Sequence, residues 1–327
     1  MKHFTLTLSA ALLLGTSALA QETRTFDVSL PLGAESHHAV GVLKFGEELE
    51  RLSEGRLTIR PHYDNALGAE REVVEGMGFG LIDMGITSTG PMGGFAPEFM
   101  LFDLPYVFKD HAHAHGFLDS EYGEQLAGVI EAAAGVKVLT WMENGFRHET
   151  NSVRAINTLE DLKGIKHRTQ ESSVQVDTWT ALGTNASPMA WTEVFTALQQ
   201  GVVESQENPV PTIYDVRFYE VQDYLTMSQH VYSPAPFMIG AALFDSLSPE
   251  DQAILLEAAE LARPVQREAS VAMEEKYLGE LQELGMEVTR PDLAPFREAV
   301  APVIEKWKDQ VGAELVDAAM SFEPATN

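Results

Sequence analysis

The chain has 327 residues and combines 49 acidic residues with 22 basic ones, for a formal net charge of −27. Such an acidic surface is repelled by the phosphates of nucleic acids and by anionic lipids, so neither is expected as a partner. Because the sequence contains no Cys, it can form no disulfide. The length suits two domains of ordinary size.

The first twenty residues are typical of a secretory signal peptide. A basic start at Lys2 is followed by an apolar run over residues 4–14 and an A-x-A end at residues 18–20. The run is too short to anchor the chain in a bilayer; a buried N-terminal helix is the alternative. We predict that residues 1–20 are removed and that the mature chain is a periplasmic protein without membrane insertion.

Strands and helices alternate in the first part of the chain. Alternating apolar residues predict strands, and apolar residues at helical spacing that end at a glycine predict helices. The predicted order is a strand over 24–31, a helix over 38–55, a strand over 56–63, a helix over 70–80 and a strand over 81–88. This order indicates a parallel sheet covered by helices on both faces.

The alternation returns later in the chain with different residues. The predicted elements are strands over 135–141 and 164–168, a helix over 172–183, an extended segment over 185–190 and a helix over 192–201. Two such units in one exported chain predict an α/β fold of two lobes with a cleft between them.

One predicted helix is unusually long. Ser248 is a suitable N-cap, Pro249 suits the first helical position, and the helical pattern can continue to Leu284. Pro264 inside it should kink the helix. A helix of this length exceeds one domain, so we expect it to brace both lobes; two helices broken at Pro264 are the alternative.

Three alternate histidines raise the possibility of a metal site. His111 and His115 would share one face of a helix, with His113 between them. No further cluster of Cys or His completes such a site, so the sequence favours a solvated helix start and no metal. Motifs for a nucleophile elbow, a P-loop or a dinucleotide site are absent from the sequence as well.

Arginines are scarce in this chain, so their positions are informative. Arg168 ends the predicted strand 164–168, and Arg147 follows the predicted strand 135–141. Ligands of open α/β sheets bind at the carboxyl ends of strands, and a guanidinium matches a carboxylate with two parallel hydrogen bonds. Arg168 is therefore predicted to bind a ligand carboxylate; a structural salt bridge to a neighbouring acid is the alternative.

Six stretches carry a resemblance to a known family. They are LGAEREVVEGMGFGLIDMGIT, FDLPYVFKD, ENGFRHETNS, LEDLKGIKHRTQES, SPMAWTEVFTALQQGVVESQENP and FYEVQDYLTMSQHVYSP, between Leu67 and Pro234. Together they resemble the solute-binding proteins of tripartite ATP-independent periplasmic (TRAP) transporters of the dicarboxylate-binding, or DctP, type. The resemblance implies the two-lobed periplasmic binding protein fold with a hinged cleft and a long helix spanning both lobes.

The resemblance also implies roles for residues of the second lobe. Arg168 would pair with the ligand's carboxylate, Arg147 would add a second contact, and Asn208 would donate a hydrogen bond at the same end. Trp191 would line the cleft. The sequence departs from the commoner family pattern at "HRTQES", which puts the floor of the pocket in doubt.

In the first lobe the resemblance points to groups that would face the other end of the ligand. They are Glu70, the loop of Thr87, Ser88 and Thr89, and also His37 and His38. The implied division assigns residues 21–144 and 234–273 to the first lobe, and residues 145–233 and 274–327 to the second.

The resemblance is nearest to members that bind sugar acids. It implies a monomeric binding protein without a cofactor, which captures an organic acid such as a uronate and delivers it to membrane permease subunits. A binder of C4-dicarboxylates or of other small carboxylates or sulfonates is the alternative within the family. A periplasmic uronate-processing enzyme and a sensory receptor subunit are the alternatives from other classes.

Overall fold

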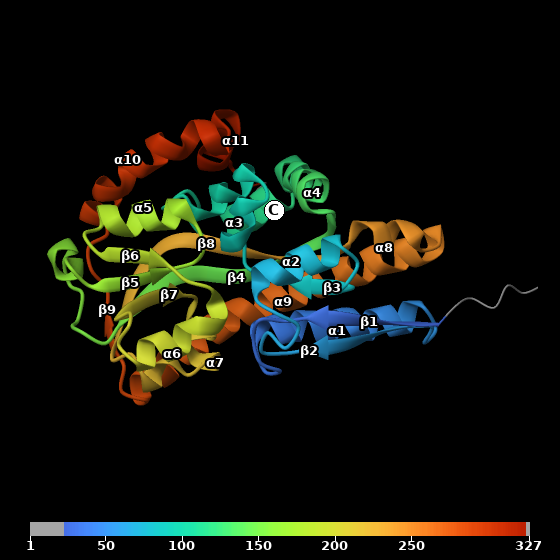
Figure 1. The fold of residues 1–327 in the computed structure, drawn as a ribbon, viewed down its shortest axis with the longest axis horizontal. Coiled ribbons are helices and arrows are strands. Elements are labelled where there is room, and N and C mark those ends of the chain that lie inside the picture. The colour runs from blue at the N-terminus through green and yellow to red at the C-terminus, as the bar shows by residue number, and fades with distance from the viewer. Residues whose placement is uncertain (1–22, 325–327) are drawn as a thin grey trace, which may run out of the picture.

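The structure, a computed structural model, describes residues 23–324, so the predicted signal peptide lies outside the described residues. All nine strands of this range belong to one sheet in the order β2-β1-β3-β8-β4-β7-β5-β6, with β9 beside β8. In Figure 1 the first strands and helices gather at one end of the molecule, the middle of the chain forms the other end, and β4 and β8 join the two.

The first end has the predicted alternation of strands and helices. It consists of β1 (Arg24–Ser29), α1 (His37–Leu52), β2 (Leu57–His62), α2 (Glu70–Gly78) and β3 (Met84–Ile86). Strand β1 pairs in parallel with both β2 and β3. The third strand is shorter than the predicted 81–88, because the chain turns into the short 3₁₀ helices η1 (Gly90–Gly94) and η2 (Pro97–Asp103).

The second end also alternates. Its elements are η3 (Leu159–Leu162), β5 (Lys166–Thr169), α5 (Ser173–Ala181), β6 (Asn185–Pro188), η4 (Trp191–Glu193), α6 (Val194–Gln199), β7 (Ser205–Asn208), α7 (Val210–Asp215), η5 (Phe218–Glu220) and β9 (Glu287–Thr289). Strand β5 pairs in parallel with β6 and β7.

Two long antiparallel strands connect the ends, and they correct the sequence-based prediction. Strands β4 (Val136–Asn151) and β8 (Tyr224–Gly240) pair along their length, with shifts of register that include one between Glu143 and Gly145. The predicted strand over 135–141 was therefore too short, and the sheet is mixed rather than parallel. The second half of β4 was not predicted because its residues are polar. In the structure these residues are buried and form hydrogen bonds with neighbouring strands.

The remaining helices cover the sheet (Figure 1). They are α3 (His111–Leu118), α4 (Glu121–Ala134), α8 (Ala241–Ser246), α9 (Pro249–Glu283), α10 (Ala294–Val311) and α11 (Ala313–Ser321). Within residues 23–324, no helix combines the length and the apolar character that a membrane span requires.

Helix α9 is one unbroken helix of 35 residues, so the alternative of two helices broken at Pro264 is wrong. Ser248 caps it as predicted, because its Oγ accepts a hydrogen bond of 3.1 Å from the Asp251 backbone N–H. The helix packs against α1 at one end of the molecule, against β4 in the middle and against α7 at the other end. It therefore braces both ends.

Candidate functional site

A small cavity lies where the two ends of the molecule meet. Its walls come from the loop after β1, the starts of α1 and α2 and the loop after β3. The strands β4 and β7 and the segments after β5, β6 and β7 complete them. The lining residues are Pro31, Leu32, His38, Glu70, Ser88, Asn144, Gln170, Trp191, Asn208 and Thr212. Both halves of the fold therefore contribute to one site.

Arg168 lies beside this cavity with an incomplete set of partners. Its side chain is 2% exposed, and its Nε and Nη2 donate to the Met189 backbone carbonyl at 3.0 and 2.7 Å. The guanidinium carbon lies 5.9 Å from the ring centre of Trp191, which lines the cavity. The third nitrogen, Nη1, is buried and has no hydrogen-bond partner among residues 23–324.

In the described part of the chain, no acidic side chain forms an ion pair with Arg168. Burial lowers the pKa of Arg168 to about 10, against the opposing influence of Glu207. The guanidinium thus remains a cation at neutral pH. Arg168 therefore forms no structural salt bridge within residues 23–324, and its buried Nη1–H is free to donate to an acceptor.

Arg147 differs from Arg168, because it already has a carboxylate partner. It lies inside β4, and its Nη2 donates to Glu207 Oε1 and to the Glu207 carbonyl, each at 2.7 Å, while Nε bonds the other carboxylate oxygen. Although burial opposes it, Arg147 and the neighbouring His230 hold the pKa of Glu207 well below its usual range. Only Nη1 of Arg147 has no partner among the described residues.

Two consequences follow for the predicted role of Arg147. The expectation that it follows a strand is wrong, because β4 continues through it to Asn151. Its guanidinium fork is used to hold β4 against β7, and it is not among the residues that line the cavity. A ligand contact from Arg147 could come only from Nη1.

Asn208 lies at the end of β7 and lines the cavity as predicted, with its Nδ2 donating to Gln206 Oε1 at 2.6 Å. Three lining polar residues were not predicted from the sequence, namely Asn144, Gln170 and Thr212. Asn144 and Gln170 stand three residues before Arg147 and two after Arg168. Their closeness in sequence to the arginines was the one signal that could have identified Asn144 and Gln170.

On the opposite wall, Glu70 begins α2 and its Oε1 accepts a hydrogen bond of 2.6 Å from the Ser88 backbone N–H. Ser88 Oγ accepts a hydrogen bond of 2.7 Å from Gln170 Nε2, which comes from the other half of the fold. Thr87 and Thr89 are buried but do not line the cavity. Of the predicted loop, therefore, Ser88 is the residue that reaches the site.

His37 and His38 begin α1 and are fully buried, and only His38 lines the cavity. Burial lowers the pKa of His37 to about 4 and that of His38 well below its ordinary value. Both imidazoles are therefore neutral at pH 7, and each can offer one donor and one acceptor.

Contacts across the cavity show that this is a closed arrangement. Besides the bond from Gln170 to Ser88, Trp191 Nε1 donates to the Pro31 carbonyl at 3.3 Å. The backbone N–H of Gly33 donates to Asp215 Oδ2 at 3.1 Å. Each bond joins a segment that precedes β4 to one that follows it.

The predicted solvated helix start at the histidines is wrong. In α3, His113 is buried, and His111 and His115 are partly buried against Glu143 of β4. None of these residues belongs to the wall of the cavity.

Comparisons with known proteins identify the family of the chain. The model of bacterial extracellular solute-binding protein family 7, DctP, matches residues 30–310. The 2,3-diketo-L-gulonate-binding periplasmic protein of Escherichia coli (strain K12) is 34% identical over 307 residues, which is 93% of each chain.

Solved structures extend the similarity to the three-dimensional fold. A TRAP periplasmic solute-binding protein of Polaromonas sp. JS666, bound to D-erythronate, is 38% identical with a TM-score of 0.89, over 92% of this chain and 99% of that one. The sugar acid binding protein DctPAm of Advenella mimigardefordensis, in complex with galactonate, is 35% identical with a TM-score of 0.89, over 92% and 97%. The chain therefore belongs to the DctP family of TRAP periplasmic solute-binding proteins.

Proposed function

We propose that this protein captures a sugar acid in the periplasm and delivers it to the membrane permease of a TRAP transporter. The observation that carries the proposal is Arg168, a buried cation with an unpartnered Nη1 beside the cavity. A carboxylate that reaches this nitrogen would supply both the missing charge and the missing acceptor. Export through the predicted signal peptide and a function as a monomer are part of the same proposal.

The remaining lining groups favour a polyhydroxylated ligand. Ser88, Thr212, Asn144, Asn208 and the neutral His38 can each bond a hydroxyl group. The ring of Trp191 offers an apolar face for the carbon chain.

Glu70 argues against a short dicarboxylate. Its carboxylate lines the cavity from the other half of the fold, so a second negative charge of a ligand placed near it would be repelled. An aldonate or uronate has hydroxyl groups there instead. The erythronate and galactonate bound to the relatives support the same ligand class.

A thermal-shift screen followed by calorimetric titration tests the ligand class, because a ligand that binds only the folded state raises Tm. The panel comprises aldonates, uronates, C4-dicarboxylates, sulfonates and neutral sugars. We expect an aldonate or a uronate to bind most tightly and neutral sugars to leave Tm unchanged. If succinate or malate binds more tightly than every sugar acid tested, the protein is a dicarboxylate binder instead.

A further inference from the structure

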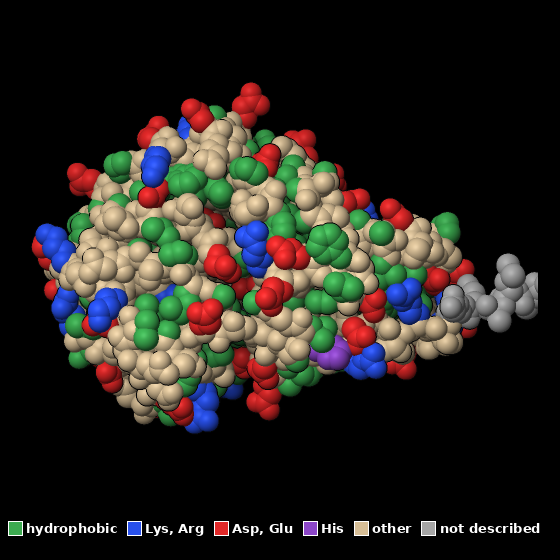
Figure 2. Space-filling view, viewed as in Figure 1, with side chains coloured by type: hydrophobic (Ala, Val, Ile, Leu, Met, Phe, Trp, Pro, Cys, Tyr) green, Lys and Arg blue, Asp and Glu red, His purple; other side chains and the backbone are tan. Residues whose placement is uncertain are grey.

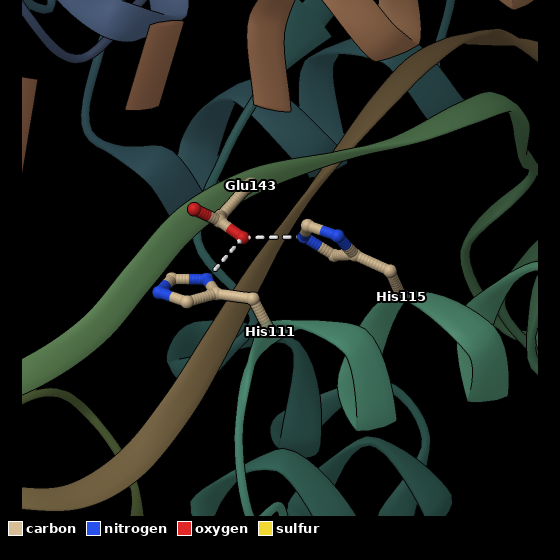
Figure 3. A group of neighbouring side chains, drawn as sticks. All are labelled: His111, His115 and Glu143. Atoms are coloured by element: carbon tan, nitrogen blue, oxygen red, sulfur yellow. Dashed lines mark hydrogen bonds and ion pairs between the residues drawn. The ribbon is translucent and has the colours of Figure 1, made fainter. Parts of the chain in front are cut away.

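Three side chains with metal-ligand atoms converge between α3 and β4 (Figure 3). His111 and His115 are four residues apart and lie on one face of α3, and Glu143 points toward them from β4. His111 Nδ1 lies 3.0 Å from Glu143 Oε2, and His115 Nε2 lies 2.5 Å from the same oxygen. The ligand atoms of the three residues lie within 4.8 Å of one another.

The two carboxylate oxygens of Glu143 differ in their hydrogen-bond partners. Its Oε2 accepts hydrogen bonds from both histidines and from the Tyr232 hydroxyl at 3.1 Å. Its Oε1 has no hydrogen-bond partner among the described residues, although the side chain is fully buried. A buried carboxylate oxygen without a partner is costly, and a cation would relieve that cost.

Neighbouring side chains would hold Glu143 and His111 in position to bind a metal. The Gln266 side chain of α9 fixes the backbone of Glu143, accepting from its N–H and donating to its carbonyl at 2.7 Å each. Glu274 Oε2 lies 3.7 Å from His111 Nε2, on the far side of the imidazole, where metal-binding histidines commonly have a carboxylate. The side chains of His111 and His115 are 28% and 21% exposed, which leaves a path from solvent.

We propose that His111, His115 and Glu143 form a binding site for a divalent transition metal such as Zn²⁺, which ties α3 to β4. Two imidazoles and one carboxylate are a donor set that Zn²⁺ accepts, with a fourth position left for water. None of the three residues lines the cavity, so the ion would brace the fold near the register shift of β4 rather than contact the bound acid.

Protons would compete with the metal at this site. An imidazole nitrogen must give up any proton before it binds a metal, so loading should release protons and strengthen as the pH rises. A titration at pH 8, repeated in two buffers of different ionisation enthalpy, measures that release.

The experiment uses the full mature chain after treatment with a chelator. Zn²⁺ is titrated by calorimetry, and the metal content is measured after gel filtration. Co²⁺ is then added as a spectroscopic substitute. We expect one Zn²⁺ per chain and the visible absorption bands of four-coordinate Co²⁺.

Two variants show where the metal binds. His115→Gln should weaken binding of Zn²⁺ by at least about tenfold. His62→Gln is the matched control, because His62 Nε2 also bonds a carboxylate, Asp27 Oδ1 at 2.6 Å, but has no second His beside it. This control should bind Zn²⁺ as the wild type does.

Three results would overturn the proposal. They are a wild-type chain that retains no Zn²⁺, a Co²⁺ complex with the pale spectrum of six-coordinate oxygen ligation, and equal Zn²⁺ binding by wild type and His115→Gln. The Co²⁺ spectrum is measured on the wild type, so it tests the proposed metal site even if His115→Gln folds poorly.

Discussion

At the scale of single residues, the two buried arginines have different partners, although the sequence placed both near strand ends. The guanidinium of Arg147 bonds the carboxylate of Glu207, whereas the guanidinium of Arg168 donates its hydrogen bonds to the Met189 carbonyl. The sequence can predict that an arginine stands near a strand end. It cannot predict which of the many acidic residues will reach that arginine, because the partner Glu207 is 60 residues away along the chain.

Replacing Arg168 should weaken ligand binding without lowering the stability of the free protein. Arg168→Met removes the charge that we propose meets the ligand, so binding should weaken by about 2–5 kcal/mol, and Arg168→Lys should restore little of it because the planar fork is lost. Without ligand, Arg168→Met should melt no lower than the wild type, because it removes a desolvated cation that has no ion-pair partner among the described residues.

Calorimetric titration with the acid found in the screen, together with melts of the free proteins, measures both effects. Arg60→Ala is the control, since the side chain of Arg60 is 62% exposed and pairs with Asp27 at the surface. An Arg168→Met protein that binds within threefold of the wild type would remove Arg168 from the site.

Breaking the buried ion pair between Arg147 and Glu207 should instead lower the stability of the free protein. Glu207→Gln leaves Arg147 buried with its charge uncompensated, and we expect it to lower the free energy of unfolding by about 3–5 kcal/mol. Urea denaturation measures the loss. In the control, Glu160→Gln, the ion pair with Lys163 is exposed, and its loss should cost less than about 1 kcal/mol. Equal losses in the two variants would contradict a structural role for the buried pair.

At the scale of helices and strands, local signals predicted most of the fold. Caps, glycine stops and apolar spacing located α1, α2, α5 and α9, and alternation located β1, β2 and β5. The second half of β4 could not be located in this way, because its stabilising contacts are not local. Glu149 accepts a hydrogen bond from Ser205 Oγ at 2.8 Å, and Thr150 Oγ1 accepts one from Gln206 Nε2 at 2.8 Å.

Helix packing supplies a prediction at this scale. Gly41 lets α1 approach α9 closely: a Cβ added there would lie 2.5 Å from Gln266 Cγ and 2.7 Å from Met142 Sδ. Gly41→Ala should therefore destabilise the protein by about 1–3 kcal/mol, the usual cost of overpacking. Because Gln266 also holds the backbone of Glu143, the strain should extend to the middle of β4.

A matched glycine serves as the control. Gly279 lies in α9 itself, and a Cβ added there would meet nothing within 4 Å. Gly279→Ala should stabilise the helix by about 0.5–1 kcal/mol. Thermal and urea unfolding of the two variants measure the difference, and a Gly41→Ala protein as stable as Gly279→Ala would show that the interface has room.

At the scale of the whole molecule, the two-lobed fold was predictable because strands and helices alternate twice in the sequence. The way the lobes join was not, since it depends on pairing between β4 and β8, which are far apart in the chain. The acidic surface predicted from the composition is visible in Figure 2, where Asp and Glu side chains are scattered over the face shown. Side chains that meet across the cavity, such as Gln170 and Ser88, were likewise beyond local patterns.

Closure of the cleft is the property that belongs to the molecule as a whole. The bonds from Gln170 to Ser88 and from Trp191 to Pro31 join the two halves in this structure, and a ligand held by Arg168 would add contacts that exist only in the closed form. A ligand favours the state with which it makes more contacts, so adding the acid should shift the population toward closure.

Solution X-ray scattering measures this shift. We expect saturating ligand to reduce the radius of gyration and to bring the profile into agreement with the one calculated from this closed structure. Arg168→Met should show no change with the same acid, and Gln170→Ala should close less completely because it loses the bond to Ser88. A wild-type profile that stays unchanged at saturation, while calorimetry reports binding, would mean that the acid enters an already closed cleft and that the lobes do not move on binding.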